Sequence, residues 1–201
     1  MSSDHLPEGW TVAKISDITI KGEQRKPSSE ETFTYVDIGS IDRDRKCISS
    51  PQYLAGNNAP SRARKVIKTG DVLVSLTRPN LNAVALVPDE LDNQIASTGF
   101  EVVKPLSVDS RFVFALTKSK DFIDSISGVV QGALYPAAKS SDVQAYTFQL
   151  PALAEQKVIA DKLDTLLAQV ETTKARLELI PEILKTFRQS VLAAAVSGKL
   201  N

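Results

Sequence analysis

The stretch IADKLDTLLAQVETTKARLELIPEILKTFRQSVLAA, residues 159–194, places an apolar or small residue at alternating intervals of four and three positions. This is the heptad spacing of a coiled coil, in which a narrow stripe of one helix faces a partner helix along its whole length. At about 1.5 Å per residue, a helix of roughly 40 residues would be about 60 Å long. The pattern therefore predicts a long helix built to pair with another one. The heptad stripe consists of Ile159, Leu163, Leu166, Val170, Thr173, Leu177, Ile180, Leu184, Phe187, Val191 and Ala194.

The ends of this helix can be predicted from single residues. Pro151 favours an extended approach, and Glu155 and Gln156 fall in or near the first turn, where the helix dipole favours acids. Gly198 is typical of the residue that ends a helix. Pro181 interrupts the middle and would cost about 3 kcal/mol there. Because the stripe keeps its phase on both sides of Pro181, we expect a kink or two abutting helices on one axis, and not a hairpin.

Residues 1–150 differ from residues 151–201, because they hold short β-branched runs separated by turn residues. We expect an α+β fold for them, with a mixed, mainly antiparallel and strongly bent sheet. Trp10, Val12 and Ile15 are expected in the core. The expected strands lie within residues 10–20, 32–41, 65–76 (two strands joined at Thr69-Gly70-Asp71), 83–87, 95–103 and 148–150, and a helix is expected within 110–122.

The net charge is zero, with 24 basic and 24 acidic residues, but the charges are unevenly distributed. Residues 43–78 carry eight basic side chains against Asp44 and Asp71. Such a window is a candidate polyanion-binding face, and arginine can also read guanine in the major groove. The alternative is that these charges are solvated in loops, or that some arginines pair with the two acids. The candidate DNA-binding residues are Lys26, Arg43, Arg45, Lys46, Arg62, Arg64, Lys65, Lys68 and Arg78.

Motifs that mark catalysis are missing from the sequence. There is no phosphate-binding glycine loop, no nucleophile elbow and no Asn/Asp-Pro-Pro-aromatic loop of an amino-methyltransferase. Glu101 and Lys104 are spaced as Glu-x-x-Lys, which would point them to opposite faces of a strand, unlike a metal-dependent nuclease. With one cysteine (Cys47) and one histidine (His5), a structural zinc site is not expected. No stretch approaches 20 apolar residues, and a cytoplasmic protein without catalysis of its own is predicted.

Taken together, several segments resemble the specificity subunit of type I restriction–modification enzymes. They occur in the family's order over nearly the whole chain, and their combination is specific although each is weak alone. The segments are LPEGW (6–10), SRARKVIKTGDVLVSLTRP (61–79), IASTGF (95–100), GALYPAAKSSDV (132–143), LPALAEQKVIADKLD (150–164) and FRQSVLAAAVSGKL (187–200).

The resemblance implies a DNA target recognition domain at 1–150 and a conserved spacer and dimerisation helix at 151–201. It implies as partners double-stranded DNA, modification (methyltransferase) subunits and a motor-nuclease subunit. S-adenosylmethionine is expected on the methyltransferase partner, and no cofactor or metal is expected in this chain. Family members hold two recognition domains and two helices, whereas one of each is found here, so we expect a half-subunit. It would form a homodimer through the helix or pair with a second half-subunit. A different possibility is an assembly adapter that docks methyltransferase subunits without reading DNA sequence.

Overall fold

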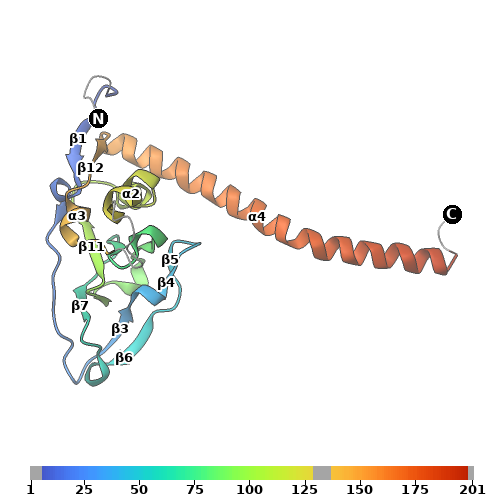
Figure 1. Ribbon diagram of the computed structural model, residues 1–201, viewed down its shortest axis with the longest axis horizontal. Helices are drawn as coiled ribbons and strands as arrows, with labels where there is room; N and C mark the ends of the chain where they lie inside the picture. Colours follow the sequence, from blue (N-terminus) through green and yellow to red (C-terminus); the bar gives the residue numbers. More distant parts are fainter. Residues whose placement is uncertain (1–5, 129–136, 199–201) are drawn as a thin grey trace. The chain divides into compact units, whose positions relative to one another are not determined.

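The computed structural model describes residues 6–128 and 137–198, and the chain divides into two compact units, Met1–Ala160 and Asp161–Asn201 (Figure 1). The first unit is built on two four-stranded sheets. One has the order β6-β3-β10-β7, and the other has the order β2-β11-β8-β9. The first sheet contains β6 (Gln52–Ala55), β3 (Thr32–Val36), β10 (Ile95–Ser97) and β7 (Ala63–Val66), and the second contains β2 (Thr19–Ile20), β11 (Phe100–Pro105), β8 (Val72–Ser75) and β9 (Val84–Leu86).

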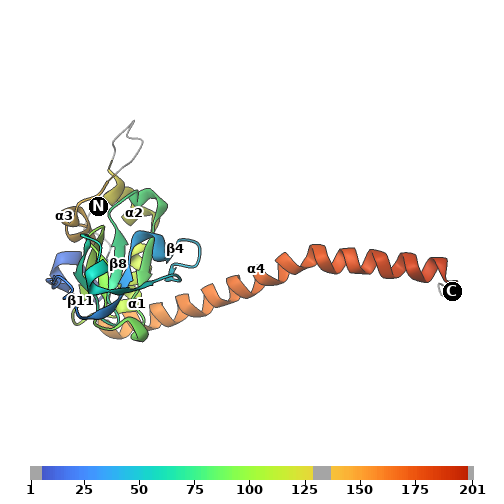
Figure 2. The same ribbon diagram turned by 90° about the horizontal axis from the view of Figure 1, so that it is seen from below.

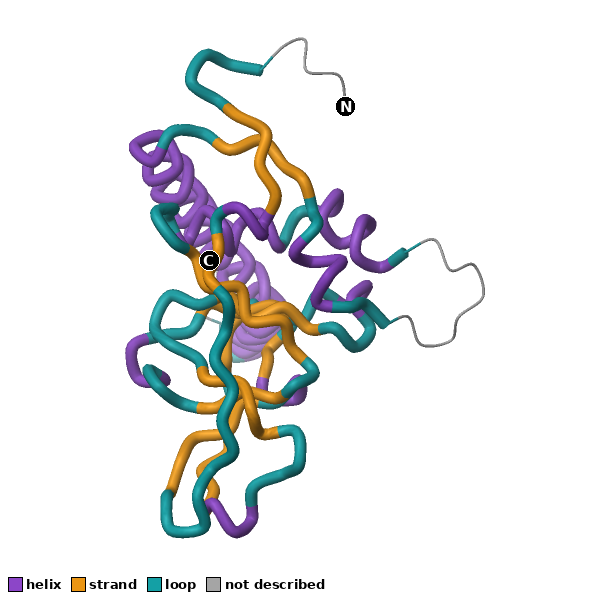
Figure 3. Tube along the Cα trace, turned by 90° about the vertical axis from the view of Figure 1, so that its left-hand side faces the viewer, coloured by secondary structure: helices purple, strands orange, loops and turns teal. Residues whose placement is uncertain are grey.

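Two further ladders complete the strands. They pair β1 (Thr11–Lys14) with β12 (Thr147–Leu150), and β4 (Ile41–Asp42) with β5 (Cys47–Ile48). Within the described ranges, the β10–β3 ladder is the one parallel pairing between named strands. Figure 3 shows how short the strands are and how much of the chain between them is loop. With the helices below, the fold is α+β and mainly antiparallel, as predicted.

Among the described residues of the first unit, three short α-helices precede α4 (Leu153–Val196): α1 (Ser110–Thr117), α2 (Lys120–Ser127) and α3 (Ser140–Gln144). Asp109 caps α1 by accepting from the backbone N–H groups of Arg111 and Phe112, and Ser119 caps α2. These two caps explain why the predicted single helix at 110–122 is in fact two helices. Both helices contribute apolar side chains to one core with strands β8 and β9, while a second core takes side chains from both four-stranded sheets, from β4 and from the turns that flank β8 and β9.

In the first strand, β1, the side chains that face the core are not those predicted. Val12 is 57% exposed, while its neighbour Ala13 is buried, as is Ile15. Since successive side chains of a strand point to opposite faces, pairing of β1 with β12 decides which one faces the core. Trp10 is only half-buried, and its indole N–H donates to Glu155 at 3.0 Å. The prediction of Trp10 and Val12 as core residues was therefore wrong for Val12 and overstated for Trp10.

Three other strand predictions need correction. The strands predicted within 65–76 exist and flank a turn at Gly70, whose φ is 82°, but β7 and β8 lie in different sheets and do not form a hairpin. The run 32–41 is not one strand, because Asp37 caps a 3-10 turn at Ile38–Ser40. That turn separates β3 from β4. The region 95–103 likewise holds two strands, β10 and β11, which pair in separate sheets.

Helix α4 (Leu153–Val196) is one unbroken helix of 44 residues with Pro181 inside it. Figure 2 shows its axis changing direction in the middle, as expected where a proline removes a backbone hydrogen bond. The predicted kink without a hairpin is confirmed. Thr173, the polar member of the heptad stripe, donates its hydroxyl to the Gln169 carbonyl at 2.8 Å. Its polar atom is therefore satisfied within its own helix.

The start of α4 is anchored in the first unit. Gln156 is buried and bridges two segments, accepting from the Asp109 backbone N–H and donating to the Pro151 carbonyl, both at 2.9 Å. Ala160 is buried as well, and Ile159 packs against the core formed with α1 and α2. The first member of the heptad stripe is thus used inside this unit.

A buried ion pair reinforces the pairing of strands β11 and β8 in the second sheet. Lys104 on β11 donates to Asp71 at 2.6 Å, and both side chains are only 7% exposed. Asp71 also accepts from the Lys68 backbone N–H at 2.8 Å, which closes the turn before β8. Burial raises the pKa of the Asp71 carboxyl, while the hydrogen bond from Lys104 opposes that rise. Each charge is therefore tolerated in the interior because the other is present.

We predict that Lys104→Met lowers the free energy of unfolding by about 3–5 kcal/mol near neutral pH, because it leaves a buried carboxylate unpaired. The loss should shrink at acidic pH, where Asp71 with its raised pKa takes up a proton in the folded state. The double variant Lys104→Met/Asp71→Asn should lose less unfolding free energy than Lys104→Met alone, because it leaves no buried charge unpaired. Lys120→Met, which removes an exposed ion pair with Asp124, is the control. Urea unfolding measures all three, and equal small losses for Lys104→Met and Lys120→Met would contradict the account.

Candidate nucleic-acid interface

Most of the predicted DNA-binding side chains lie at the surface of the first unit. Lys46, Arg64 and Lys65 are half-buried. The exposed ones are Lys26, Arg43, Arg45, Arg62, Lys68 and Arg78. The nine candidates come from four places along the chain: the loop between β2 and β3, which holds Lys26, the turn between β4 and β5, strand β7 with its flanks, and the loop between β8 and β9.

The turn between β4 and β5 is shaped by an aspartate. The Asp42 carboxylate accepts from the backbone N–H groups of Asp44 and Arg45, both at 2.9 Å. Short polar side chains favour such turns because they replace a backbone acceptor. The turn leaves Arg43 and Arg45 exposed at its tip. Lys46 is the last residue of this turn and has a φ of 55°. Its ammonium donates to the Asn82 carbonyl at 2.7 Å, which joins the turn to the loop after β8.

The second basic segment follows β7 at the edge of its sheet. The chain at 23–25 runs beside it, since the backbone N–H of Arg25 donates to the Arg64 carbonyl at 2.8 Å and Gln24 bridges to Lys65. At the other side, the Thr98 N–H donates to the Arg62 carbonyl at 2.9 Å. Arg62 and Lys68, at the two ends of this segment, keep their side chains exposed.

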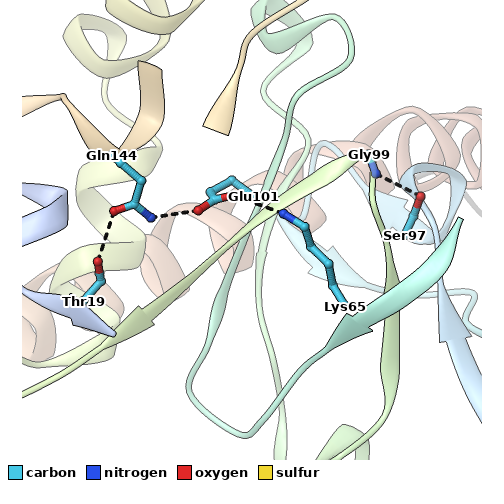
Figure 4. Close-up of polar contacts among 6 residues, drawn as sticks. All are labelled: Thr19, Lys65, Ser97, Gly99, Glu101 and Gln144. Atoms are coloured by element: carbon cyan, nitrogen blue, oxygen red, sulfur yellow. Dashed lines mark hydrogen bonds and ion pairs between the residues drawn. The ribbon is translucent and has the colours of Figure 1, made fainter. Parts of the chain in front are cut away.

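Lys65 belongs to an internal polar network, which Figure 4 shows. Its ammonium pairs with Glu101 at 3.1 Å, and Glu101 accepts at 2.8 Å from Gln144, which in turn accepts from Thr19 at 3.1 Å. The network connects β7, β11, α3 and β2, and Lys65 and Glu101 also line a small cleft of about 180 Å³. Lys65 therefore holds strands together, and contact with a phosphate would require it to leave Glu101.

Several members of this site were missed by sequence reasoning. Glu101 was considered only as a nuclease residue, and neither Gln144 nor Asn82 was considered at all. The partners of Glu101 and Asn82 lie 36 to 43 residues away in the chain, and Gln144 also contacts Thr19, 125 residues away, so no local spacing reveals them. The alternative that an arginine of the basic window pairs with Asp71 was also wrong, because the ion-pair partner of Asp71 is Lys104.

The heptad stripe of α4 is largely exposed beyond its first two members. Leu177 is 60% exposed and Phe187 is 62% exposed. Ile159 packs against the core of the first unit and Leu163 is half-buried. The other large stripe members that lie exposed are Leu166, Val170, Ile180, Leu184 and Val191.

Other candidate sites can be checked only in part. Among residues 6–128 and 137–198, no three His, Cys, Asp or Glu side chains are grouped as they would be around a metal ion. No helix in these ranges combines the length and apolar character needed to cross a membrane. His5, residues 132–136 of the GALYPAAKSSDV segment and residues 199–200 of the FRQSVLAAAVSGKL segment lie outside the described residues.

With this fold and surface in hand, comparison with known proteins defines the class. Residues 7–182 match the Type I restriction modification DNA specificity domain, and the chain belongs to that family. The chain is 34% identical over 210 residues to the specificity subunits of the type I restriction enzymes EcoKI of Escherichia coli and StySPI of Salmonella potsdam. These matches cover 100% of this chain and 45% of each relative. The chain thus spans about half the length of the curated relatives it matches.

Solved structures agree with the family. The HsdS subunit from Thermoanaerobacter tengcongensis superposes with a TM-score of 0.80 at 37% identity, covering 86% of this chain and 46% of that one. A chain from work on complex assembly and conformational transition of the type I R-M system gives a TM-score of 0.86 at 35% identity, covering 95% and 50%. Both similarities lie well above the level at which only the fold is shared.

The exposed cations of the β7 segment generate a prediction about DNA affinity. Arg62→Ala and Lys68→Ala should each weaken binding to all sequences and flatten the log–log salt dependence by roughly one unit per lost phosphate contact. Lys65→Ala should also weaken binding. The separate variant Glu101→Gln leaves Lys65 in place and removes its ion-pair partner, so it tests whether the effect of Lys65→Ala comes through the loss of the Lys65–Glu101 pair. The measurement is duplex affinity between about 50 and 200 mM salt. Unchanged affinity and slope in an Arg62→Ala/Lys68→Ala double variant would exclude this segment from the interface.

Proposed function

We propose that this chain is a DNA recognition component of a type I restriction–modification system, reading one half of a bipartite target. The observation that carries the proposal is the family match over residues 7–182, which includes both the mixed β unit and most of helix α4. The exposed arginines and lysines of the first unit supply phosphate contacts, which position a protein on DNA, while a few other side chains would read base edges.

Helix α4 supports the second part of the proposal, which concerns assembly. A helix with large apolar side chains exposed along one stripe requires a partner, because burying each such side chain contributes about 1.5–3 kcal/mol. The heptad spacing suits a second copy of the same helix, since an antiparallel pair related by a two-fold axis is self-complementary. Two copies would then present two recognition units. Together they would match the length of the curated relatives, of which this chain covers 45%.

The remaining partners follow from the family and are proposed on that basis. The paired helices would dock modification subunits, which bind S-adenosylmethionine and methylate the DNA, and a motor-nuclease subunit would join them. The chain itself would be non-catalytic and would act in the cytoplasm. Support for the non-catalytic role comes from the sequence, which lacks the motifs of methyltransferases and nucleases.

The recognition function is tested by binding to a library of duplexes at one fixed salt concentration, with the chain assembled with its modification subunit. We expect one short set of base pairs to be preferred by about 10³-fold or more over random duplex. Methylated sites mapped in cells that express both proteins should contain the same base pairs. Equal affinity for all sequences would contradict DNA recognition and favour an adapter that assembles methyltransferase subunits.

Pairing through the heptad stripe gives a separate prediction. Leu166→Asp/Leu177→Asp should weaken self-association by more than about 100-fold, because each substitution buries an unpaired carboxylate in the interface. Leu179→Asp/Leu192→Asp is the matched control: both leucines are exposed on the same helix but lie outside the stripe. Sedimentation at tens of micromolar separates the cases. A monomeric unmodified protein, or equal weakening by the control, would show that the stripe does not mediate self-pairing.

A further inference from the structure

The loop between β8 and β9 has an unusual backbone. Arg78 has a φ of 49° and Asn82 a φ of 45°, and a short 3-10 turn, Pro79–Leu81, lies between them. Left-handed φ values are uncommon outside glycine, and they persist only where the surroundings impose them. Five residues other than glycine adopt positive φ in the described part of the chain, and three of them meet here, since Lys46 contacts Asn82.

The loop is held at its base by backbone and side-chain hydrogen bonds. Ser75 donates its hydroxyl to the Thr77 carbonyl at 2.9 Å and accepts from the Thr77 N–H at 3.3 Å. The Leu76 N–H donates to the Gly99 carbonyl at 2.9 Å, and Pro79 is buried. The conformation is therefore set before any ligand binds, so little ordering entropy would be lost on binding.

Lys46 fixes the far end of the same loop. Its ammonium donates to the Asn82 carbonyl at 2.7 Å, and the side chain is half-buried. Burial lowers the pKa of Lys46, Asp44 opposes this, and Lys118 and Arg43 lower the pKa further. Because the Lys46 ammonium is partly desolvated and donates to the Asn82 carbonyl, we assign Lys46 the role of holding the loop in place. Lys118 and Arg43 add positive potential around Lys46.

The side chains that this rigid loop presents suit base edges. Arg78, Asn80 and Leu81 are exposed. Arginine binds guanine O6 and N7 through two hydrogen bonds, asparagine binds adenine N6 and N7 in the same way, and an apolar side chain contacts the thymine methyl group. The lysines and arginines around the loop would contact phosphates, which position the protein but carry no sequence information.

We propose that the loop Thr77–Asn82 is a base-reading element, in which Arg78 and Asn80 contact base edges in the major groove and Lys46 is a positioning residue that holds the loop. This inference rests on the proposed DNA recognition function and adds to it the residues that determine specificity. It separates Arg78 from the other exposed arginines, such as Arg45, which would serve only as phosphate contacts.

The test compares base preference with overall affinity, using the chain assembled with its modification subunit and a duplex library at fixed salt. Arg78→Ala should lower discrimination at one base pair by roughly 5- to 150-fold while other positions keep their preference. Arg78→Lys should lose the same discrimination and keep the salt slope, because lysine retains the charge but lacks the planar fork. Asn80→Ala should relax a neighbouring base pair.

Two further variants separate reading from positioning and from general attraction. Lys46→Met should blur the same base pairs as Arg78→Ala and Asn80→Ala, which a general loss of stability would not do. Arg45→Ala, the matched control on the adjoining turn, should weaken all sequences equally and flatten the salt slope by about one unit. Two results would overturn this inference alone. In the first, Arg78→Ala, Asn80→Ala and Lys46→Met leave the base preferences unchanged. In the second, these variants weaken binding to all sequences equally, as Arg45→Ala does. An unmodified protein that shows no base preference would instead overturn the proposed function, and this inference with it.

Discussion

The apolar stripe of helix α4 is the constraint on which the rest of the account depends. Its large side chains, from Leu166 to Val191, stay exposed within a single chain, and water is a poor environment for such a row. The helix continues through Pro181 with the stripe in phase, although a proline in a helix interior costs about 3 kcal/mol. Because the cost is tolerated without a break, the stripe is best explained as one continuous interface. Under the proposed function, a second copy along this interface would turn a chain with one recognition unit into an assembly with two.

The recognition unit solves a different physical problem, which is how to hold loops rigid on a small mixed fold. Its sheets are short, and ion pairs at low exposure reinforce them, as Lys104 and Asp71 do across the paired strands β11 and β8. The Lys65–Glu101–Gln144 network connects segments that no ladder joins, because β7 and β11 lie in different sheets and α3 is a helix. The network holds Lys65, a member of the candidate DNA-binding set, inside the unit, while Arg62 and Lys68 at the two ends of the same segment stay exposed. Scaffold and surface residues thus alternate within one short part of the basic window.

Local patterns predicted what local physics determines. The heptad spacing, Pro151 and Gly198 are consistent with the observed start and end of α4, and the short apolar runs predicted β8, β9 and β12. The errors came from long-range pairing. Whether Val12 or Ala13 faces the core depends on the register with β12, some 135 residues later. Whether 65–76 forms a hairpin depends on β10 and β11, which take β7 and β8 into separate sheets. Likewise, the charge window predicted which residues are basic, but not that Lys65 is held by Glu101, nor that Lys46 holds the loop at Asn82.

The central claim is that α4, paired through its stripe, separates two recognition units by a length that sets the target geometry. Methylation-site mapping in cells with the modification subunit tests it most directly, using insertions in the stripe between Thr172 and Thr173. Seven added residues keep the heptad phase and lengthen the helix by about 10 Å. Since B-DNA rises about 3.4 Å per base pair, the account predicts a gap between half-sites that is longer by about three base pairs, and impaired assembly when four residues are added. An unchanged gap after the seven-residue insertion would contradict the claim.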